Sequence, residues 1–183
     1  MRRVVAAEDE AVRPIVAVRV NNSNNGKSEI VYALLDSGSD MDVISEGLVE
    51  RLQIKPTWTE LTLVTLDNRE SMKRAFVGVS VESIDREYVA DVRKALVGNL
   101  LTSEADLPPS KRDISKYSHL SDIIFEDYDA KVEMIVGAAH VDAWVFPSAE
   151  HCRKGTQDQP RGLFTKFGWT MVGIATKTTT REA

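Results

Sequence analysis

The sequence has a single cysteine, few aromatic residues and no long hydrophobic run. One cysteine, Cys152, excludes an internal disulfide and is typical of proteins from a reducing compartment. No apolar run approaches the length that spans a membrane, and the N-terminus lacks the apolar core of a signal peptide. We therefore expect an intracellular, cytoplasmic protein that does not bind a membrane.

Clustered positive charge is also missing. The formal net charge is -5, and the Lys and Arg residues form no sustained stripe, whereas nucleic-acid-binding domains usually carry a basic patch. We do not expect nucleic acid as a partner, and we expect no cofactor. A chain of 183 residues with 43% hydrophobic content is consistent with one domain that has a sizeable core.

An apolar run that ends in a carboxylate is the most informative stretch. The run from Ile30 to Leu35 predicts a short buried strand, which the chain leaves at Asp36. Gly38 supplies the conformational freedom that a tight turn needs. A carboxylate at a strand end is partly removed from water, and such an environment suits acid–base chemistry. The alternative is that this Asp-Ser-Gly triplet is only an Asx-type turn.

The segments around Asp36 predict mainly strands. Residues 15–20 predict a strand, and the Asn25-Gly26 pair after it predicts a hairpin whose return strand carries Asp36. Ser45 is a candidate cap for a helix in which Leu48, Val49 and Leu52 share one face. From residue 59 to residue 97 the apolar positions alternate, which predicts a β-meander.

A second apolar strand, Val132–Val136, ends in Gly137, and a short helix is predicted through His140 and Trp144. The pairing of Leu-Leu-Asp-Ser-Gly-Ser with this later Met-Ile-Val-Gly resembles the retropepsin-like aspartic proteases, and within them the protease region of Pao/BEL-type retrotransposon polyproteins. The resemblance covers about residues 15 to 175, and three further pieces contribute to it: Val43–Leu52, His119–Ile123 and Thr165–Gly173.

The resemblance implies an all-β, closed-barrel fold with one or two short helices, completed as a homodimer. It places the protease domain at residues 14–175. Because residues 1–13 and 176–183 are weakly patterned, we expect them to be flexible. A polar loop is expected over residues 101–116, and a closing strand or hairpin over residues 164–174.

The resemblance also assigns roles to residues. Asp36 matches the catalytic carboxylate, Ser37 a hydroxyl that ties two active-site loops together, and Gly38 a glycine that lets the substrate backbone approach. Asp40 matches an acidic position that often pairs with an arginine, but Ala138 stands where that arginine would be. The expected active-site loop is Asp36, Ser37, Gly38, Ser39 and Asp40, supported from below by Ile135, Val136 and Gly137.

A polar turn about thirty residues past Asp36 matches the flap that folds over bound peptide in the retropepsin-like proteases. The candidate flap residues are Asp67, Asn68, Arg69 and Glu70. Flaps of this kind are often rich in glycine, and this turn contains none.

Peptide hydrolysis by carboxylates needs two of them, one as the base and the other as the acid. The chain has no second Asp-Ser-Gly or Asp-Thr-Gly triplet, so we expect a second copy to supply the other Asp36. The expected partners are an identical chain and a peptide or polyprotein substrate. Two alternatives stay open: a catalytically silent dimerisation or peptide-binding module with the same fold, and a plain β-rich structural domain.

Competing sites have less support. His140, His151 and Cys152 do not have the spacing of a common zinc site, and we expect no metal. Ser37 and Ser39 lack the flanking glycines of a nucleophile elbow. For the dimer interface we expect apolar surface near the C-terminus, from Phe167, Trp169 and Met171.

Overall fold

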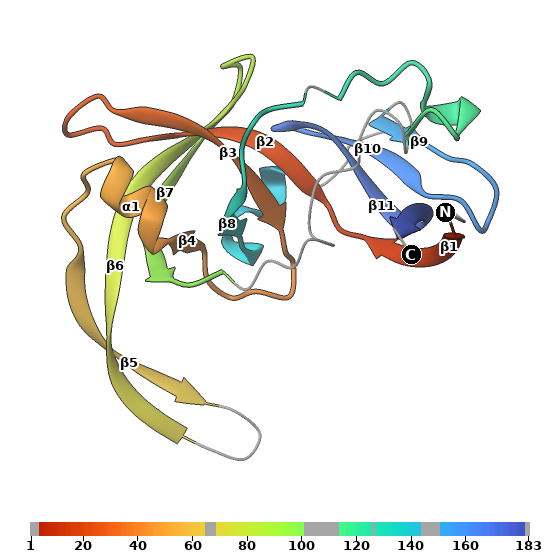
Figure 1. Cartoon of the computed structure of the whole chain (residues 1–183). Coiled ribbons are helices and arrows are strands. Elements are labelled where there is room, and N and C mark those ends of the chain that lie inside the picture. The colour runs from red at the N-terminus through yellow and green to blue at the C-terminus, as the bar shows by residue number, and fades with distance from the viewer. Residues whose placement is uncertain (1–3, 65–68, 101–113, 126, 144–150, 182–183) are drawn as a thin grey trace.

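A closed barrel of six strands forms the centre of the protein (Figure 1). The computed structural model describes residues 4–64, 69–100, 114–125, 127–143 and 151–181. The barrel strands, in their order around it, are β2 (Ile15–Asn21), β3 (Ser28–Leu35), β8 (Val132–Val136), β4 (Val43–Ser45), β7 (Val89–Gly98) and β6 (Arg69–Ser83). Pairing of β6 with β2 closes the circle. The predicted all-β closed barrel is confirmed, while its completion as a homodimer stays a prediction.

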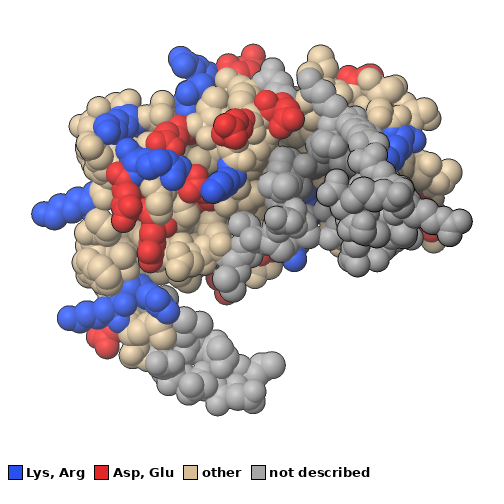
Figure 2. All heavy atoms as spheres, viewed as in Figure 1, with Lys and Arg blue, Asp and Glu red and all other residues tan. Residues whose placement is uncertain are grey.

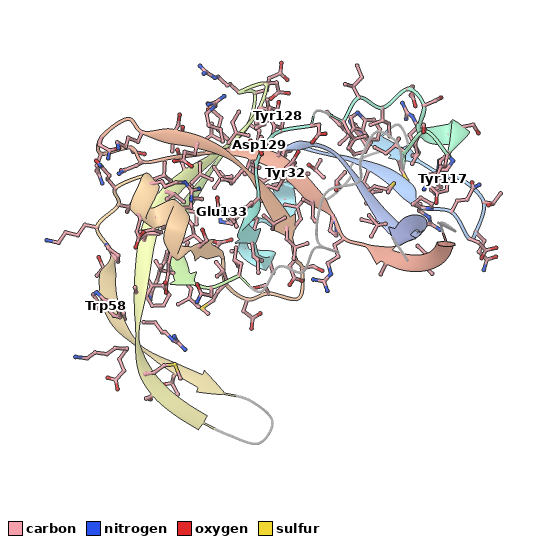
Figure 3. All side chains as sticks on the ribbon, viewed as in Figure 1. Tyr32, Trp58, Tyr117, Tyr128, Asp129 and Glu133 are labelled. Carbon is pink, nitrogen blue, oxygen red and sulfur yellow. The ribbon has the colours of Figure 1, made fainter. Side chains whose placement is uncertain are left out.

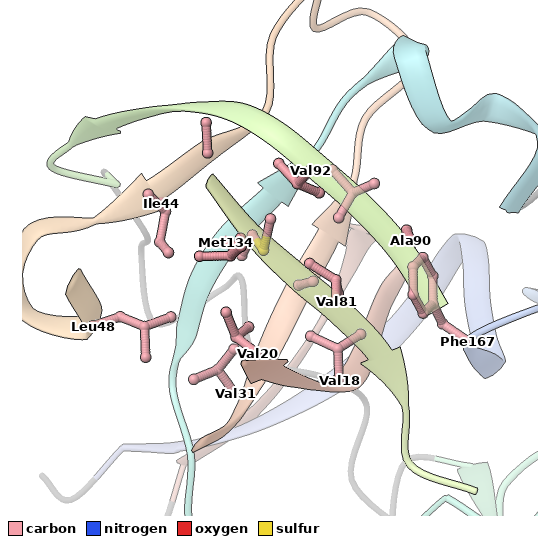
Figure 4. Packing of buried hydrophobic residues seen from close by; sticks show 14 of the residues in the cluster. Val18, Val20, Val31, Ile44, Leu48, Val81, Ala90, Val92, Met134 and Phe167 are labelled. Carbon is pink, nitrogen blue, oxygen red and sulfur yellow. The ribbon is translucent and has the colours of Figure 1, made fainter. Parts of the chain in front are cut away.

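Small and branched apolar side chains fill the barrel. Met134 and Ile44 are fully buried at its centre, where they pack with valines from four other strands (Figure 4). β-Branched residues suit this position because they pack well on a pleated surface. Leu35, the last residue of β3, is 2% exposed and belongs to the same cluster. The core therefore extends to the residue before Asp36 and holds the end of that strand in place.

The hairpin between β2 and β3 is confirmed. Gly26 adopts a φ of 72°, which glycine reaches at little cost. Asn22 is buried at the start of the loop, and its side-chain amide donates to the carbonyl oxygen of Leu52 at 3.0 Å. Asn25 donates to the same oxygen at 3.1 Å. The hairpin loop is therefore tied to the end of the α-helix at Glu46–Arg51.

That helix, α1 (Glu46–Arg51), begins as the sequence predicts. Ser45 is its N-cap, and the Ser45 hydroxyl accepts the Leu48 amide at 3.1 Å. At the other end the Gln53 amide donates to Glu50 and the Ile54 amide to Val49, each at 3.0 Å. These two hydrogen bonds form a Schellman motif, in which Gln53 adopts a left-handed φ of 54°.

A charged cluster links α1 to two barrel strands. The guanidinium of Arg51 donates to Glu133 on β8 and to Glu29 on β3, and Ser45 donates to Glu133 at 2.9 Å. The hydrogen bonds that Arg51 donates to the two carboxylates, first to Glu133 and then to Glu29, raise the pKa of Arg51 above its usual value. Figure 3 shows Glu133 on the side of β8 that faces the helix. The cluster fixes the helix against the strand that runs under Asp36.

The predicted meander is also confirmed. Strand β5 (Thr57–Val64) pairs with β6, and β6 pairs with β7. Beyond the barrel, β5 and the first half of β6 form a long two-stranded hairpin that extends away from it (Figure 1). Trp58 lies on β5 near the base of this hairpin (Figure 3) and is 67% exposed.

A second sheet has four strands and contains both ends of the described chain. Its strands, in order, are β1 (Val4–Val12), β11 (Gly168–Arg181), β10 (Arg161–Thr165) and β9 (Cys152–Arg153). The β10–β11 hairpin agrees with the prediction for residues 164–174. Within the end segments expected to be flexible, residues 4–12 form β1 and pair with residues 173–181 of β11, while the flexibility of these segments stays a prediction. Each segment is weakly patterned alone, and it forms a strand because the other end of the chain lies beside it.

The expectation of apolar surface is wrong for Phe167 and Met171, whereas Trp169 is only partly buried. Phe167 is 4% exposed and belongs to the barrel core, with its ring edge-on to Tyr88. Met171 is 1% exposed and packs with Tyr117 and neighbours in a second core. That core lies between the second sheet and residues 114–125, which include the short helix η2 (Ser118–Leu120). These side chains therefore stabilise the protomer itself.

Charged side chains of both signs are interspersed on the surface. On the face in Figure 2, Lys and Arg alternate with Asp and Glu, and neither kind gathers over one element. No helix among the described residues is long and apolar enough to cross a membrane. Residues 101–113, most of the predicted polar loop, lie outside the described residues.

Candidate active site

Asp36 lies where β3 leaves the barrel core. Strand β3 runs parallel to β8, with Leu34 opposite Ile135 and Leu35 opposite Val136. The Asp36 amide continues this ladder and donates to the carbonyl oxygen of Val136 at 3.0 Å. The backbone that carries the carboxylate is therefore fixed by two central strands, and only the residues after it form a loop.

The side chain of Asp36 is half-buried and makes one hydrogen bond within the described part of the chain. Its Oδ1 accepts the Gly38 amide at 2.9 Å, and the Asp36 carbonyl oxygen accepts the Ser39 amide at 3.1 Å. The Asx turn considered from the sequence is thus present. Among the described residues no donor contacts Oδ2 of Asp36. Ser37 and Gly38 are exposed on the same turn, so the free carboxylate oxygen has accessible surroundings.

Gly137 packs directly under this turn. A β-carbon on residue 137 would lie 2.7 Å from the Ser39 carbonyl oxygen and 2.9 Å from that of Met41. The next residue, Ala138, donates its amide to the Ser39 carbonyl oxygen at 2.9 Å. The predicted loop and the predicted supporting strand are therefore in contact, and the close approach requires glycine.

The acidic residue that joins the two segments is Asp42. Asp40, the candidate from the sequence, is exposed and makes no side-chain hydrogen bond or ion pair with a described residue. Asp42 is 7% exposed. Its Oδ1 accepts the Gly137 amide at 2.9 Å, and its Oδ2 lies 3.1 Å from Nε2 of His140. The sequence analysis did not identify Asp42 as a site residue. The available signal is that its neighbours Met41 and Val43 are apolar, which favours burial of the carboxylate between them.

The helix predicted after Gly137 is present as η3 (Ala138–Ala143), a short 3-10 segment. Its backbone kinks at His140, where φ is -112° and ψ is 28°. Trp144 lies outside the described residues. His140 also lines a hollow of about 380 Å³ between residues 40–42, Phe76 of β6 and the outer face of β7.

The candidate flap is only partly described. Asp67 and Asn68 lie outside the described residues, whereas Arg69 and Glu70 begin strand β6 opposite Val64 and Leu63. The hairpin that leads to this turn projects from the same side of the barrel as the loop after Asp36, the lower side in Figure 1. Its position relative to bound peptide stays a prediction.

The residues considered as metal ligands do not converge. His140 contacts Asp42, His151 stacks on Phe164, and Cys152 lies on β9. Within the described ranges no three His, Cys, Asp or Glu residues are placed to hold a metal ion.

Comparisons with known proteins find likenesses among solved structures. No known family profile and no curated protein sequence matches this chain. Among solved structures, the chain is similar to a retropepsin-like aspartic protease from Rickettsia conorii, with 12% identity over 99% of both chains and a TM-score of 0.39. A TM-score this low carries no conclusion about activity, so the geometry around Asp36 has to support any assignment of function.

Proposed function

We propose that this chain is one subunit of an aspartic endopeptidase that is active as a homodimer. The observation that carries the proposal is the placement of Asp36. Two barrel strands fix its backbone, Oδ2 of the carboxylate accepts no hydrogen bond from a described residue, and Ser37 and Gly38 beside it are exposed. A rigid carboxylate at an accessible turn is what acid–base catalysis on a bound peptide needs.

The chemistry follows from bringing two such turns together. At about three ångströms apart, two carboxylates hold one proton between them, because both cannot stay ionised side by side. The ionised carboxylate takes a proton from a water molecule, which attacks the peptide carbonyl carbon. The protonated carboxylate gives its proton to the carbonyl oxygen. When the tetrahedral intermediate collapses, the carboxyl group that took the proton from water gives it to the leaving amine as the C–N bond breaks. The other carboxylate takes a proton from a hydroxyl of the intermediate, so the pair again holds one proton.

A second copy has to supply the other carboxylate. The sequence contains no second Asp-Ser-Gly or Asp-Thr-Gly triplet. Asp42, the buried carboxylate of the same turn, uses both oxygens on Gly137 and His140. In a two-fold dimer the exposed residues Ser37 and Gly38 would face their copies across the axis. Ser37 would then donate hydrogen bonds between the two turns, and Gly38 would leave room for the substrate backbone.

The substrate class is an extended peptide, and processing of a polyprotein like those of Pao/BEL-type elements is the role we infer from the sequence resemblance. The hairpin of β5 and β6 leads to the candidate flap on the side of the barrel where Asp36 emerges. Folding of this hairpin over a bound strand would exclude water from the reacting bond.

Digestion of a peptide library by the wild type and by Asp36→Asn tests the proposal. We expect cleavage by the wild type, an activity that rises and falls around two pH values because the carboxylate pair titrates as a unit, and inhibition by a statine-type transition-state analogue. The Asn variant should fold and not cleave. Equal cleavage by the variant would refute the proposal, and peptide binding without any cleavage by the wild type would identify a silent binding module.

A further inference from the structure

Asp42 is a buried carboxylate with a complete set of partners. Burial of an ionised group is costly unless it is paired and hydrogen-bonded. Both oxygens of Asp42 meet this requirement: Oδ1 accepts the Gly137 amide at 2.9 Å, and Oδ2 lies 3.1 Å from Nε2 of His140. The Asp42 carbonyl oxygen also accepts the Leu96 amide from β7 at 2.8 Å. Asp42 thus connects the turn after Asp36 to three other segments.

These contacts belong to a ladder that fixes the turn against β8 and η3. At the start of the turn, the Asp36 amide donates to Val136, and in its middle the Ser39 carbonyl oxygen accepts from Ala138. At its end the link runs through the Asp42 side chain. The first two links use only backbone atoms, so any residue type makes them. The third depends on a carboxylate at position 42 and on the group that orients it.

His140 is the orienting group. Its ring reaches Asp42 from the kink in η3, and its own amide donates to the Gly137 carbonyl oxygen at 3.1 Å. The imidazole side chain is 16% exposed, so it is packed in place. Charged residues face the hollow that His140 lines, namely Asp40, Asp91, Arg93 and Lys94. Asp91 is already paired with Arg93 at 3.2 Å.

We propose that Asp42 and His140 are positioning residues. They hold the turn after Asp36 against the end of β8 and thereby determine the position of the Asp36 carboxylate. This inference rests on the proposed function of Asp36. The two residues act through the backbone of the turn and do not touch the substrate. Two carboxylates that must meet across a dimer axis tolerate little displacement, since an error of about 1 Å costs roughly 100-fold in rate.

The test uses three variants of the full chain. His140→Ala removes the group that orients Asp42. His140→Gln is the conservative variant, because the glutamine side-chain amide reaches about as far as Nε2 and donates a hydrogen bond. Asp142→Asn is the matched control, since it neutralises an exposed carboxylate of the same short helix that pairs with Lys166 at 3.3 Å. The measurements are amide hydrogen exchange by NMR at Gly137 and Ala138, and kcat and KM on a cleaved peptide.

In His140→Ala we expect exchange at the Gly137 and Ala138 amides to accelerate at least about tenfold, because their hydrogen bonds open more often. The value of kcat should fall about 10- to 100-fold while KM changes by less than about threefold. His140→Gln should restore both readouts, and Asp142→Asn should match the wild type.

Wild-type exchange at Gly137 in His140→Ala would overturn the inference, whether or not the chain cleaves peptides. Faster exchange together with an unchanged kcat would also overturn it. If the wild type is inactive and exchange accelerates only in His140→Ala, the proposed protease function fails, while the anchoring of the turn by His140 stands. The two failures are therefore distinguishable.

Discussion

Gly137 lies so close to Ser39 that a β-carbon on residue 137 would stand 2.7 Å from the Ser39 carbonyl oxygen. The two closest atoms are the backbone carbonyl oxygens of Ser39 and Met41, so rotation of a side chain cannot relieve the overlap. We predict that Gly137→Ala pushes the turn away from β8. The variant should lose roughly 1–3 kcal/mol in free energy of unfolding, as overpacked sites do, and it should lose peptide cleavage more severely than stability. Denaturant unfolding and a cleavage assay measure the two effects.

Gly98 provides the control for this substitution. A β-carbon there meets nothing within 4 Å, and Gly98 ends strand β7 beside Ser45. Gly98→Ala should stay within about 0.5 kcal/mol of the wild type. If Gly137→Ala behaves like Gly98→Ala in both assays, the contact between Gly137 and the turn does not hold Asp36 in place.

The requirement for two copies of Asp36 predicts poisoning by an inactive subunit. A heterodimer of wild type and Asp36→Asn has only one ionisable catalytic carboxylate, so it should not cleave. With a ninefold excess of the variant and free exchange of subunits, activity per wild-type chain should fall to about one tenth by mass action. A cleavage assay on the equilibrated mixture, run beside sedimentation at several concentrations, measures this.

Dilution provides a second readout of the same requirement. Specific activity should decrease as the protein is diluted through its dimer dissociation constant. A monomer with full activity at every concentration would contradict the two-copy mechanism and would require a second carboxylate within the chain.

The turn between β6 and β7 predicts a pH dependence of stability. In this turn Asp85 accepts the Ser83 hydroxyl and the Glu87 amide. The Ser83 hydroxyl, and after it the Glu87 amide, hold the pKa of Asp85 below its usual value of 3.8. Because the folded-state pKa is the lower one, Asp85 contributes stability above the unfolded-state pKa, and this contribution is lost as the pH falls through the folded-state pKa.

Asp85→Asn isolates that contribution. The wild type should exceed the variant in free energy of unfolding by an amount that is constant above about pH 5 and shrinks below about pH 4. The difference should be less than about 1 kcal/mol, because Asp85 is exposed and water screens its interactions. Urea unfolding at a series of pH values measures it. A difference that grows as the pH falls would have the wrong sign for this turn.

The end of helix α1 predicts a stabilising substitution. Gln53 has a φ of 54°, a conformation that glycine adopts without the cost that a β-carbon brings. Gln53→Gly should raise the free energy of unfolding by roughly 0.5–1 kcal/mol and leave cleavage unchanged. Gln53→Ala is the control, since it removes the side chain but keeps the β-carbon, and it should give no such gain. Thermal unfolding separates the two variants.

Local patterns predict much of this fold. The Asn25-Gly26 pair predicts the hairpin that carries Asp36, Ser45 predicts the start of α1, and alternating valines predict the strands around the barrel. Each of these features depends on residues a few positions apart, where turn chemistry, capping and periodicity determine the structure. The contact between the Asp36 turn and Gly137 was predicted from the resemblance of these two segments to the retropepsin-like aspartic proteases.

Contacts across long distances in the sequence are harder to predict. Asp40 and Asp42 both lie in the short polar segment between Asp36 and strand β4. Their sequence context does not distinguish them, and only the packing of β4 against β8 shows that Asp42 is the buried one. The burial of Met171 has a similar cause, because it depends on residues 114–125 folding onto the second sheet. The strand at residues 4–12 forms only because residues 173–181 lie beside it.

The pairing of β1 with β11 also bears on how the chain can be re-engineered. Val4 lies opposite Arg181 in this ladder, and Figure 1 shows β1 beside the last part of β11. A short flexible linker between them should close the backbone into a ring without disturbing the barrel. New ends opened in the Asn24-Asn25 loop would then give a circular permutant in which β1 and β11 are consecutive in sequence. In that permutant the β1–β11 pair would become a local hairpin, with a smaller loop-closure entropy to overcome during folding.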